Sequence, residues 1–410
     1  MTEARKCAVL GSPGYLEHRG RNPQELLDLV GNNTGNLVFQ LATSRILGDQ
    51  VQHLTAQSGG YVIDSGASVL VFPAANHLRP KGITEDFVRY LESIRLPAVV
   101  VGLGAQASLE EDANDVVGRI LLDSAVVRFV DWLRDRAIFV GVRGALSHEV
   151  CRKLGLETVV TGCPSRFLNL TPNLGAALSS RLHELREDFV PGQHRLAVAA
   201  DAPFESYHKG RGSIRLERRL YRWAMESGGL HVQQSGGPEA IALGSGDLRW
   251  LSVQSANSIR NMWRPGVSLD DFIRDCGVLC RAYSDARVWA SDLAQCDVSV
   301  GVRMHGNMAA IGASVPGIVI AHDARTSELI ESMALPWVSL QEAQSAETFT
   351  ALLEAVRFDG ENFDRQRIHA ARLLHAGLNS AGLELAPEFV QFVGAADDES
   401  GLGYEEGDEA

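Results

Sequence analysis

The sequence predicts an α/β protein made of two doubly wound parallel-sheet domains, and three observations lead to this prediction. Apolar runs typical of strands alternate with helical stretches along most of the chain, as they do in parallel sheets that helices cover on both faces. A chain of 410 residues is long for one core, so two domains are expected. A stretch rich in charge, Pro and Gly, REDFVPGQH at residues 186–194, separates the strand runs into two groups.

The elements follow one another in a regular order within each half. In the first half the strand runs are CAVLG from Cys7, SVLVFPA from Ser68, AVVVGLG from Ala98, AIFVGVR from Ala137 and ETVVTG from Glu157. In the second half they are RLAVAA from Arg195, GLHVQQS from Gly229, DVSVGV from Asp297, GIVIA from Gly317 and PWVSL from Pro336. The expected domains are residues 1–188 and 189–395, followed by an acidic tail at 396–410. The helical stretch from Phe363, FDRQRIHAARLLHAGLNS, is expected to pack back across the cleft between them.

Charge and hydropathy exclude some classes of protein. The formal net charge of −13 argues against nonspecific nucleic-acid binding. The tail from Asp397 carries seven acids and no base, and its small apolar content predicts disorder. No apolar run is long enough to span a bilayer, and the first apolar stretch resembles a strand more than a signal-peptide core. These features predict a cytoplasmic protein.

Cysteine and glycine spacing argue against a metal or a dinucleotide cofactor. The six cysteines form no CxxC pair, and Cys276 and Cys280, four apart, have no partner pair to complete a metal set. We therefore expect buried free thiols. Gly102 and Gly104 form a tight turn after a strand, but two glycines without a third are not a dinucleotide fingerprint. No cofactor is predicted.

The segment DVSVGVRMHGNMAAIGASVPGIVIAHD, from Asp297 to Asp323, is the most informative part of the chain. Its pattern is strand, turn, helix, strand, and in such a unit anionic ligands meet the strand end and the N-terminus of the following helix. Arg303 and His305 are two residues apart in the turn, so both side chains are expected on the same side, where a fixed cation and a titratable group could address one anion. The alternative is an arginine that caps a helix or pairs with a surface acid.

Three other segments offer weaker binding signals. Arg143 ends a strand beside a helix start, a place suited to capturing phosphate or carboxylate, although it could also be a surface residue. Gly104 is expected to let the backbone approach a ligand. The polar turn GNNTGN, from Gly31 to Asn36, precedes the helix LVFQLATSRIL, and its amides could hold a sugar or phosphate, while a helix cap by Thr34 or Asn36 explains it equally well.

The segment from Tyr207 to Trp223 is strongly basic, with six Lys or Arg residues against one Glu. It could meet the diphosphate of a nucleotide or lipid carrier, or an anionic glycan. A solvated helix face that balances the acidic surface is the alternative. Asp201 and His208 lie close by in the sequence and are candidate acid–base groups.

Together these motifs resemble those of the polysaccharide pyruvyltransferase family. The family has an Arg-x-His motif, a helix, a Gly or Ser before Pro, and an apolar strand that ends in an acid, here Asp323. NTGN at residues 33–36, VVVGLGAQ at residues 99–106 and GVRGALSHEVCRKLGL from Gly141 resemble further family segments, so the likeness spans about residues 30 to 340. Two positions depart from the family: Arg325 follows the acid where many members have Lys, and Asn36 replaces an Asp, which makes Asn36 a binder and not a base.

The resemblance implies a GT-B-like architecture with the acceptor on the N-terminal domain and the donor on the C-terminal domain. It implies an enzyme that moves the pyruvyl group of phosphoenolpyruvate onto a saccharide, as a cyclic ketal, in the synthesis of a polysaccharide or a carrier-linked glycan. His305 would donate or shuttle the proton. Asp323 and Asp285 are the candidate bases, although a helix cap is favoured for Asp285. The substrate-binding residues would be Gly35, Asn36, Gly104, Arg143, Arg303 and Arg325.

Two other functions remain open from the sequence. A GT-B glycosyltransferase would place Arg303 and Arg325 on the diphosphate of a nucleotide sugar, but no ribose-binding acid is evident after GIVIA. A noncatalytic saccharide-binding relative is the second, against which the Arg-x-His motif argues. The acceptor would be a saccharide or a sugar linked to a lipid or nucleotide, and a lipid-linked acceptor would require peripheral membrane contact, for which no amphipathic anchor stands out.

Overall fold

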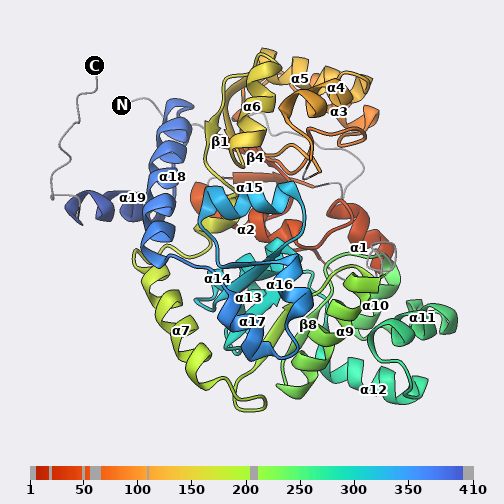
Figure 1. The fold of residues 1–410 in the computed structure, drawn as a ribbon. Coiled ribbons are helices and arrows are strands. Elements are labelled where there is room, and N and C mark those ends of the chain that lie inside the picture. The colour runs from red at the N-terminus through yellow and green to blue at the C-terminus, as the bar shows by residue number, and fades with distance from the viewer. Residues whose placement is uncertain are drawn as a thin grey trace.

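Two six-stranded sheets, each covered by helices, form the protein (Figure 1). This computed structural model describes residues 6–17, 21–48, 51–55, 66–108, 110–203 and 211–399. All strand pairs in both sheets are parallel. The predicted α/β class with two parallel sheets is therefore confirmed. Among the described residues, no helix is both long and apolar enough to cross a membrane.

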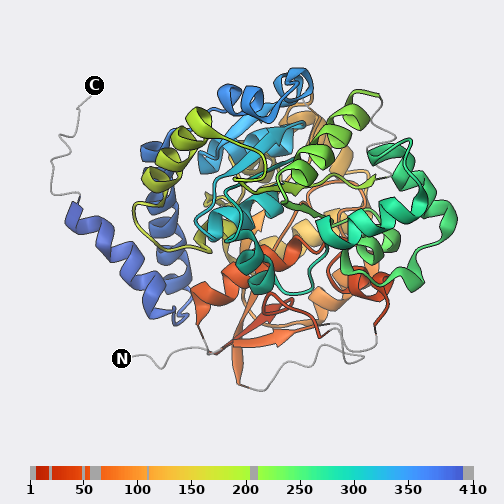
Figure 2. The same ribbon diagram turned by 90° about the horizontal axis from the view of Figure 1, so that it is seen from below.

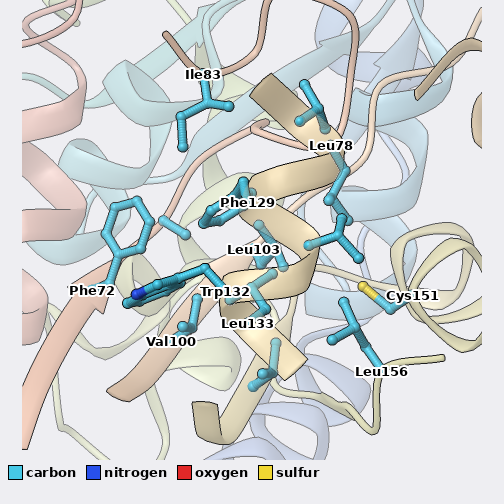
Figure 3. Close-up of a cluster of buried hydrophobic side chains, with 14 of the residues drawn as sticks. Phe72, Leu78, Ile83, Val100, Leu103, Phe129, Trp132, Leu133, Cys151 and Leu156 are labelled. Carbon is cyan, nitrogen blue, oxygen red and sulfur yellow. The ribbon is translucent and has the colours of Figure 1, made fainter. Parts of the chain in front are cut away.

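The first sheet has the strand order β2-β1-β3-β4-β5-β6. Its strands are β1 (Lys6–Leu10), β2 (Val51–Leu54), β3 (Ala67–Pro73), β4 (Ala98–Leu103), β5 (Ala137–Val142) and β6 (Val159–Val160). One face packs against α3 (Glu85–Ser93), α4 (Ala113–Ile120), α5 (Ser124–Arg136) and α6 (Ala145–Lys153). Figure 3 shows this core, in which the rings of Phe129 and Trp132 stack at 6.1 Å beside Phe72.

The second sheet has the strand order β12-β11-β10-β7-β8-β9. Its strands are β7 (Leu196–Ala199), β8 (Leu230–Val232), β9 (Cys280–Arg281), β10 (Val298–Gly301), β11 (Gly317–Ala321) and β12 (Trp337–Ser339). The helices that follow these strands are α9 (Arg211–Glu226), α10 (Pro238–Ser245), α11 (Val253–Trp263), α12 (Leu269–Leu279), α13 (Ala286–Leu293), α14 (Met304–Gly312), α15 (Ala324–Met333), α16 (Leu340–Ser345) and α17 (Phe349–Ala355). Every predicted strand run forms a strand, and the two strands that were not predicted, β2 and β9, are short sheet edges.

Several helices join the two halves. The shorter α1 (Pro23–Leu29) and the longer α2 (Asn36–Leu47) follow β1, yet Leu37 and Phe39 of α2 belong to one buried cluster with Trp289 and Met308 of the second half. The 3₁₀ helix η2 (Pro164–Phe167) and α7 (Leu174–Asp188) make the connection between the sheets. Figure 2 shows the molecule from below, with α2 between strands of the first sheet and helices of the second half.

The end of the chain returns to the first sheet. The helices α18 (Gly360–Ser380) and α19 (Pro387–Glu399) follow the second half of the chain, and α18 runs beside the first sheet (Figure 1). Their side chains Leu374 and Phe389 are buried in one cluster with Val9 and Val71. The helical stretch from Phe363 therefore covers the face of the first sheet opposite α5. Of the predicted tail, residues 396–399 form the end of α19, and residues 400–410 lie outside the described residues.

The strand orders locate the sites where ligands should bind. In the first sheet the chain moves from β1 outward to β2 and then to β3 on the other side, so the order reverses between β1 and β3. In the second sheet it reverses between β7 and β10. Open α/β sheets bind ligands outside the carboxyl ends of the strands at such reversals. Both points of reversal open onto the cavities described next.

Candidate active site

A cavity of about 310 Å³ lies between the two halves, and side chains from both line it. We call it the arginine cavity, because Arg79 and Arg143 of the first half face Arg303 and Arg325 of the second across it. The predicted residues Asn36 and His305 also line it. Its other polar lining residues are Asn33, Asn76, His77, Gln106, Gln234 and Thr326.

Arg143 follows β5 and precedes α6, as predicted, and is 3% exposed. Its Nε–H donates to the Gly102 carbonyl at 2.9 Å and its Nη1–H to Oδ1 of Asn76 at 2.7 Å, while Nη2 is buried with no partner among the described residues. Hydrogen bonds thus hold two nitrogens of Arg143 in place, and the third can donate to a bound anion. Gly104 makes this possible, because a Cβ there would lie 2.7 Å from Oδ1 of Asn76 and 2.8 Å from Cδ of Arg143.

Arg303 is the N-cap of α14, and His305 lies in the first turn of that helix. The strand β10 ends at Gly301. Arg303 and His305 therefore do not lie on a strand, and the strand geometry from which their common side was predicted does not apply to them. Both nevertheless line the arginine cavity. Nη2 of Arg303 lies 2.9 Å from Oδ1 of Asp201. Asp201 follows β7, and this ion pair therefore bridges the strand ends at the point where the second sheet reverses.

His305 is 7% exposed. Burial, followed by the positive charges of Arg143 and Arg325, holds the pKa of His305 well below its ordinary value. Its ring lies 5.3 Å from that of Phe39, and its Nε2 lies 3.6 Å from Sγ of Cys163. An anion bound to the arginines would offset their charge and raise the pKa of His305.

The start of α2 lies against His305. A Cβ on Gly35 would lie 2.5 Å from Nε2 of Gln234 and 3.1 Å from Cβ of His305, so any larger residue here would require these side chains to move. Asn36 donates from Nδ2 to the Val30 carbonyl at 2.8 Å, which holds its side chain at the cavity wall. The predicted polar turn thus reaches the site from the first half of the chain.

Asp323 is the N-cap of α15 and accepts from the backbone N–H and hydroxyl of Thr326 at 2.7 and 2.5 Å. Its Oδ2 lies 3.3 Å from Nη2 of Arg325. Burial alone would raise the pKa of Asp323, but Arg325, His322 and Thr326 together lower it below its ordinary value. Asp323 lines a neighbouring cavity of about 450 Å³, together with Asp201 and Arg303. Its contacts are those of a residue that holds Arg325 in place.

Asp285 lies in neither of these cavities and has a structural role. It caps α13, accepting from the Arg287 backbone N–H at 2.8 Å, and its carboxylate lies 2.7 Å from Nη2 of Arg287. The cap interpretation of Asp285 is confirmed.

A buried contact between the halves lies directly behind the arginines. The N-cap of α6, Gly144, provides no side-chain cap. Glu328 of α15 supplies one instead, because its carboxylate accepts from the Ser147 backbone N–H at 2.6 Å and from the Ser147 hydroxyl at 3.0 Å. The hydroxyl in turn accepts from the Ala105 N–H at 2.9 Å. Burial raises the pKa of Glu328. Since α6 follows Arg143 and α15 carries Arg325, this contact sets the distance between two binding arginines.

His77 and Arg79 are site residues that the sequence reasoning missed. They follow β3 in the loop ANHLRPKG, and a His-x-Arg pair directly after a buried strand is the same signal that Arg303 and His305 carry in reverse order. Asn76, Gln106 and Gln234 gave no comparable signal, because neutral amides after strands are common in turns.

A second cavity, of about 410 Å³, adjoins the arginine cavity at the carboxyl ends of β1 and β3. We call it the sheet-end cavity. The rings of Phe39, Phe72 and Phe87 line it together with polar groups that include Ser12 and Gln40, and Gln40 accepts from the Ser12 hydroxyl at 2.6 Å. The described residues that line both cavities are Gly31, Asn36, Ala75, His77 and Gly82.

The described part of the basic segment, from Arg211 to Trp223, is not among the residues that line the arginine cavity. Residues 207–210, which include His208, lie outside the described residues. In α9, Arg218 donates to the Met262 carbonyl at 3.0 Å, and Arg219 donates to the Ala343 carbonyl at 3.4 Å. These carbonyls are at the C-terminal ends of α11 and α16, so both arginines stabilise helix ends. All six cysteines are buried free thiols, as predicted.

A cavity lined by arginines thus lies between two parallel-sheet domains in a GT-B-like arrangement, with the imidazole of His305 in the first turn of a helix beside it. The model of the polysaccharide pyruvyl transferase family matches residues 43–324. The chain belongs to this family and is a transferase enzyme. The matched part contains Arg143, Arg303, His305 and Asp323, and Arg325 follows it directly. No curated protein matches the chain.

Proposed function

We propose that the protein transfers the pyruvyl group of phosphoenolpyruvate to two hydroxyls of one saccharide, forming a cyclic ketal during synthesis of a polysaccharide or a carrier-linked glycan. The observation that carries this proposal is the arginine cavity, where Arg79, Arg143, Arg303 and Arg325 converge. Phosphoenolpyruvate carries a phosphate and a carboxylate a few bonds apart, and guanidinium groups bind both in a bidentate manner. A member of a pyruvyl transferase family with this cavity is suited to that donor.

The binding roles follow from position. Arg303 and Arg325 stand beside the N-termini of α14 and α15, where helix amides and dipoles favour phosphate. Arg143, with its unused Nη2, faces them from the first domain and would take the carboxylate. Asp323 acts through Arg325, whose guanidinium it pairs.

The transfer reaction requires a group that gives a proton to phosphoenolpyruvate in the arginine cavity. C3 of the donor must gain a proton, C2 must bond to an acceptor oxygen, and the bond from C2 to the phosphate oxygen must break before the second hydroxyl closes the ketal. Of the two hydroxyl protons released, one balances the proton gained at C3 and the other balances the phosphate that leaves. His305 would protonate C3, because the bound trianion offsets Arg143 and Arg325 and raises the pKa of His305.

The acceptor would enter the sheet-end cavity. Its aromatic rings offer apolar faces for a sugar ring, and its amides and hydroxyls suit sugar hydroxyls. Apart from His77, the charged or titratable groups among the described lining residues are Asp28 and Lys81, one of each sign, which suits an uncharged ring better than a diphosphate. The cavity opens into the arginine cavity, so acceptor oxygens there would approach the donor.

Calorimetry with phosphoenolpyruvate, and in parallel with UDP, tests the donor. Losing the charged hydrogen bonds of Arg303 in Arg303→Ala should weaken phosphoenolpyruvate binding about 10- to 100-fold. Arg274→Ala removes an arginine on α12 that pairs with Asp271, and should change the affinity by less than about twofold. Binding of UDP without phosphoenolpyruvate would instead favour a glycosyltransferase that uses a nucleotide sugar.

A further inference from the structure

His77 occupies the boundary between the two cavities. It follows β3 at the point where the first sheet reverses its strand order, and it lines both the arginine cavity and the sheet-end cavity. The other described residues that line both are Gly31, Asn36, Ala75 and Gly82. Among these shared described residues, His77 alone has an ionisable side chain.

The hydrogen bond of His77 sets which ring nitrogen carries the proton. Nδ1 lies 2.9 Å from the Gly82 carbonyl oxygen. A carbonyl can only accept, so Nδ1 carries the hydrogen, and the neutral ring has its lone pair on Nε2. The rings of Phe72 and Phe129, at 5.3 and 6.0 Å, pack against the imidazole and hold its orientation.

The charge state of the ring agrees with this geometry. Burial lowers the pKa of His77 to about 4, with Arg143 and Arg79 adding to the effect against the opposing hydrogen bond to Gly82. At neutral pH the ring is therefore neutral and able to accept a proton. Lys81 is a further cation on the same loop. A donor anion on the arginines would offset these positive charges and strengthen Nε2 as a base only when the donor is bound.

From this position, we infer that His77 is the catalytic base that receives the proton of the attacking acceptor hydroxyl. The inference rests on the proposed function. As the acceptor oxygen bonds to C2 of the donor, its proton passes to Nε2 of His77, and C3 gains its proton from His305. The bond from C2 to phosphate oxygen then breaks, the second hydroxyl bonds to C2, and its proton leaves with the phosphate. Solvent takes the proton from His77 and returns one to His305.

The carboxylates near the site are placed less well for this step. Asp323 caps α15 and pairs with Arg325. Asp201 pairs with Arg303 and lines the neighbouring cavity and not the arginine cavity. Neither is among the residues that line the sheet-end cavity. His77 is where acceptor and donor would meet.

The substitution His77→Asn tests this role with little disturbance, because the Asn amide can still donate to the Gly82 carbonyl but cannot accept a proton. Phosphoenolpyruvate affinity should stay within about twofold, while phosphate release in the presence of methyl hexopyranosides should fall about 100-fold or more. His148→Asn is the matched control, since Nδ1 of His148 lies 2.7 Å from the Thr158 hydroxyl and His148 is among the lining residues of neither cavity. A wild-type rate in His77→Asn would overturn the inference.

Nitrogen NMR of protein labelled with ¹⁵N-histidine gives a second readout that needs no acceptor. We expect the His77 ring with hydrogen on Nδ1 at pH 7, and a rise in its pKa from about 4 when phosphoenolpyruvate is added. A ring with hydrogen on Nε2, or a pKa that the donor does not move, would also overturn the inference. If phosphoenolpyruvate does not bind the wild-type protein at all, the proposed function fails first, and calorimetry shows this separately.

Discussion

Replacing Glu328 tests whether the contact between the domains places the binding arginines. Its carboxylate accepts two hydrogen bonds from Ser147 across the interface. Gly144 is required for this approach, because a Cβ there would lie 2.4 Å from Cγ of Glu328. Glu328→Ala leaves the first turn of α6 without a cap and removes the link between the helix after Arg143 and the helix that carries Arg325.

The expected size of the effect follows from the bonds lost. Each hydrogen bond to a charged group is worth about 1.5–3 kcal/mol. Part of this is offset in the native protein, because burial raises the pKa of Glu328 and so disfavours its charged form. A net loss of about 2 kcal/mol is expected, which corresponds to roughly 30-fold weaker donor binding if the closed arrangement is needed to bind. Glu328→Gln keeps one acceptor oxygen and should lose about half as much free energy.

Two assays measure this loss. Calorimetry gives the phosphoenolpyruvate affinity, and hydrogen exchange gives the protection of the Ser147 amide, which should fall in Glu328→Ala. Glu331→Ala is the control, because Glu331 is an exposed acid on the same helix. Unchanged affinity together with unchanged protection of Ser147 would refute the reasoning.

The remaining predictions concern the site itself. Phosphoenolpyruvate binding at pH 7 should take up protons, because the donor raises the pKa of His305 from below its ordinary value; the buffer dependence of the calorimetric enthalpy measures this uptake, which should shrink in His305→Asn. Gly104→Ala should displace Arg143 and weaken donor binding about tenfold, whereas Gly118→Ala, where a Cβ meets nothing within 4 Å, should not. Folding lowers the pKa of Asp323, so its stabilisation is present at neutral pH and is lost as the pH falls through its folded pKa; Asp323→Asn should cost about 1 kcal/mol at neutral pH and flatten the acid side of the thermal stability profile.

The fold could be predicted because strands of parallel sheets are buried on both faces. Such strands read as continuous apolar, β-branched runs, as in VLVF and AVVV. The strand β2 was missed because VQHL is a half-exposed edge without such a run, and β9 has only two residues. The stretch from Phe363 was expected to pack back across the cleft, but the sequence did not indicate that α18 would cover one face of the first sheet.

The sequence predicted those residues of the site that follow the end of a strand. Arg143 and Arg303 stand at strand ends, and parallel topology brings such ends to one edge. The contact between Glu328 and Ser147 spans 181 residues and depends on how the domains dock, which no local pattern encodes. His77 was missed although its motif was visible, because the reasoning gave weight to glycine turns and passed over the loop after β3.

Product analysis tests the central claim most directly. Phosphoenolpyruvate labelled with ¹³C at C3 would be incubated with the enzyme and a panel of saccharides and lipid-linked or nucleotide-linked sugars, and the products followed by NMR and mass spectrometry. The account predicts a labelled ketal methyl group on a sugar and one phosphate released for each ketal, both lost in Arg303→Ala. Binding of phosphoenolpyruvate without any labelled sugar across the panel, or label that remains in free pyruvate, would contradict it.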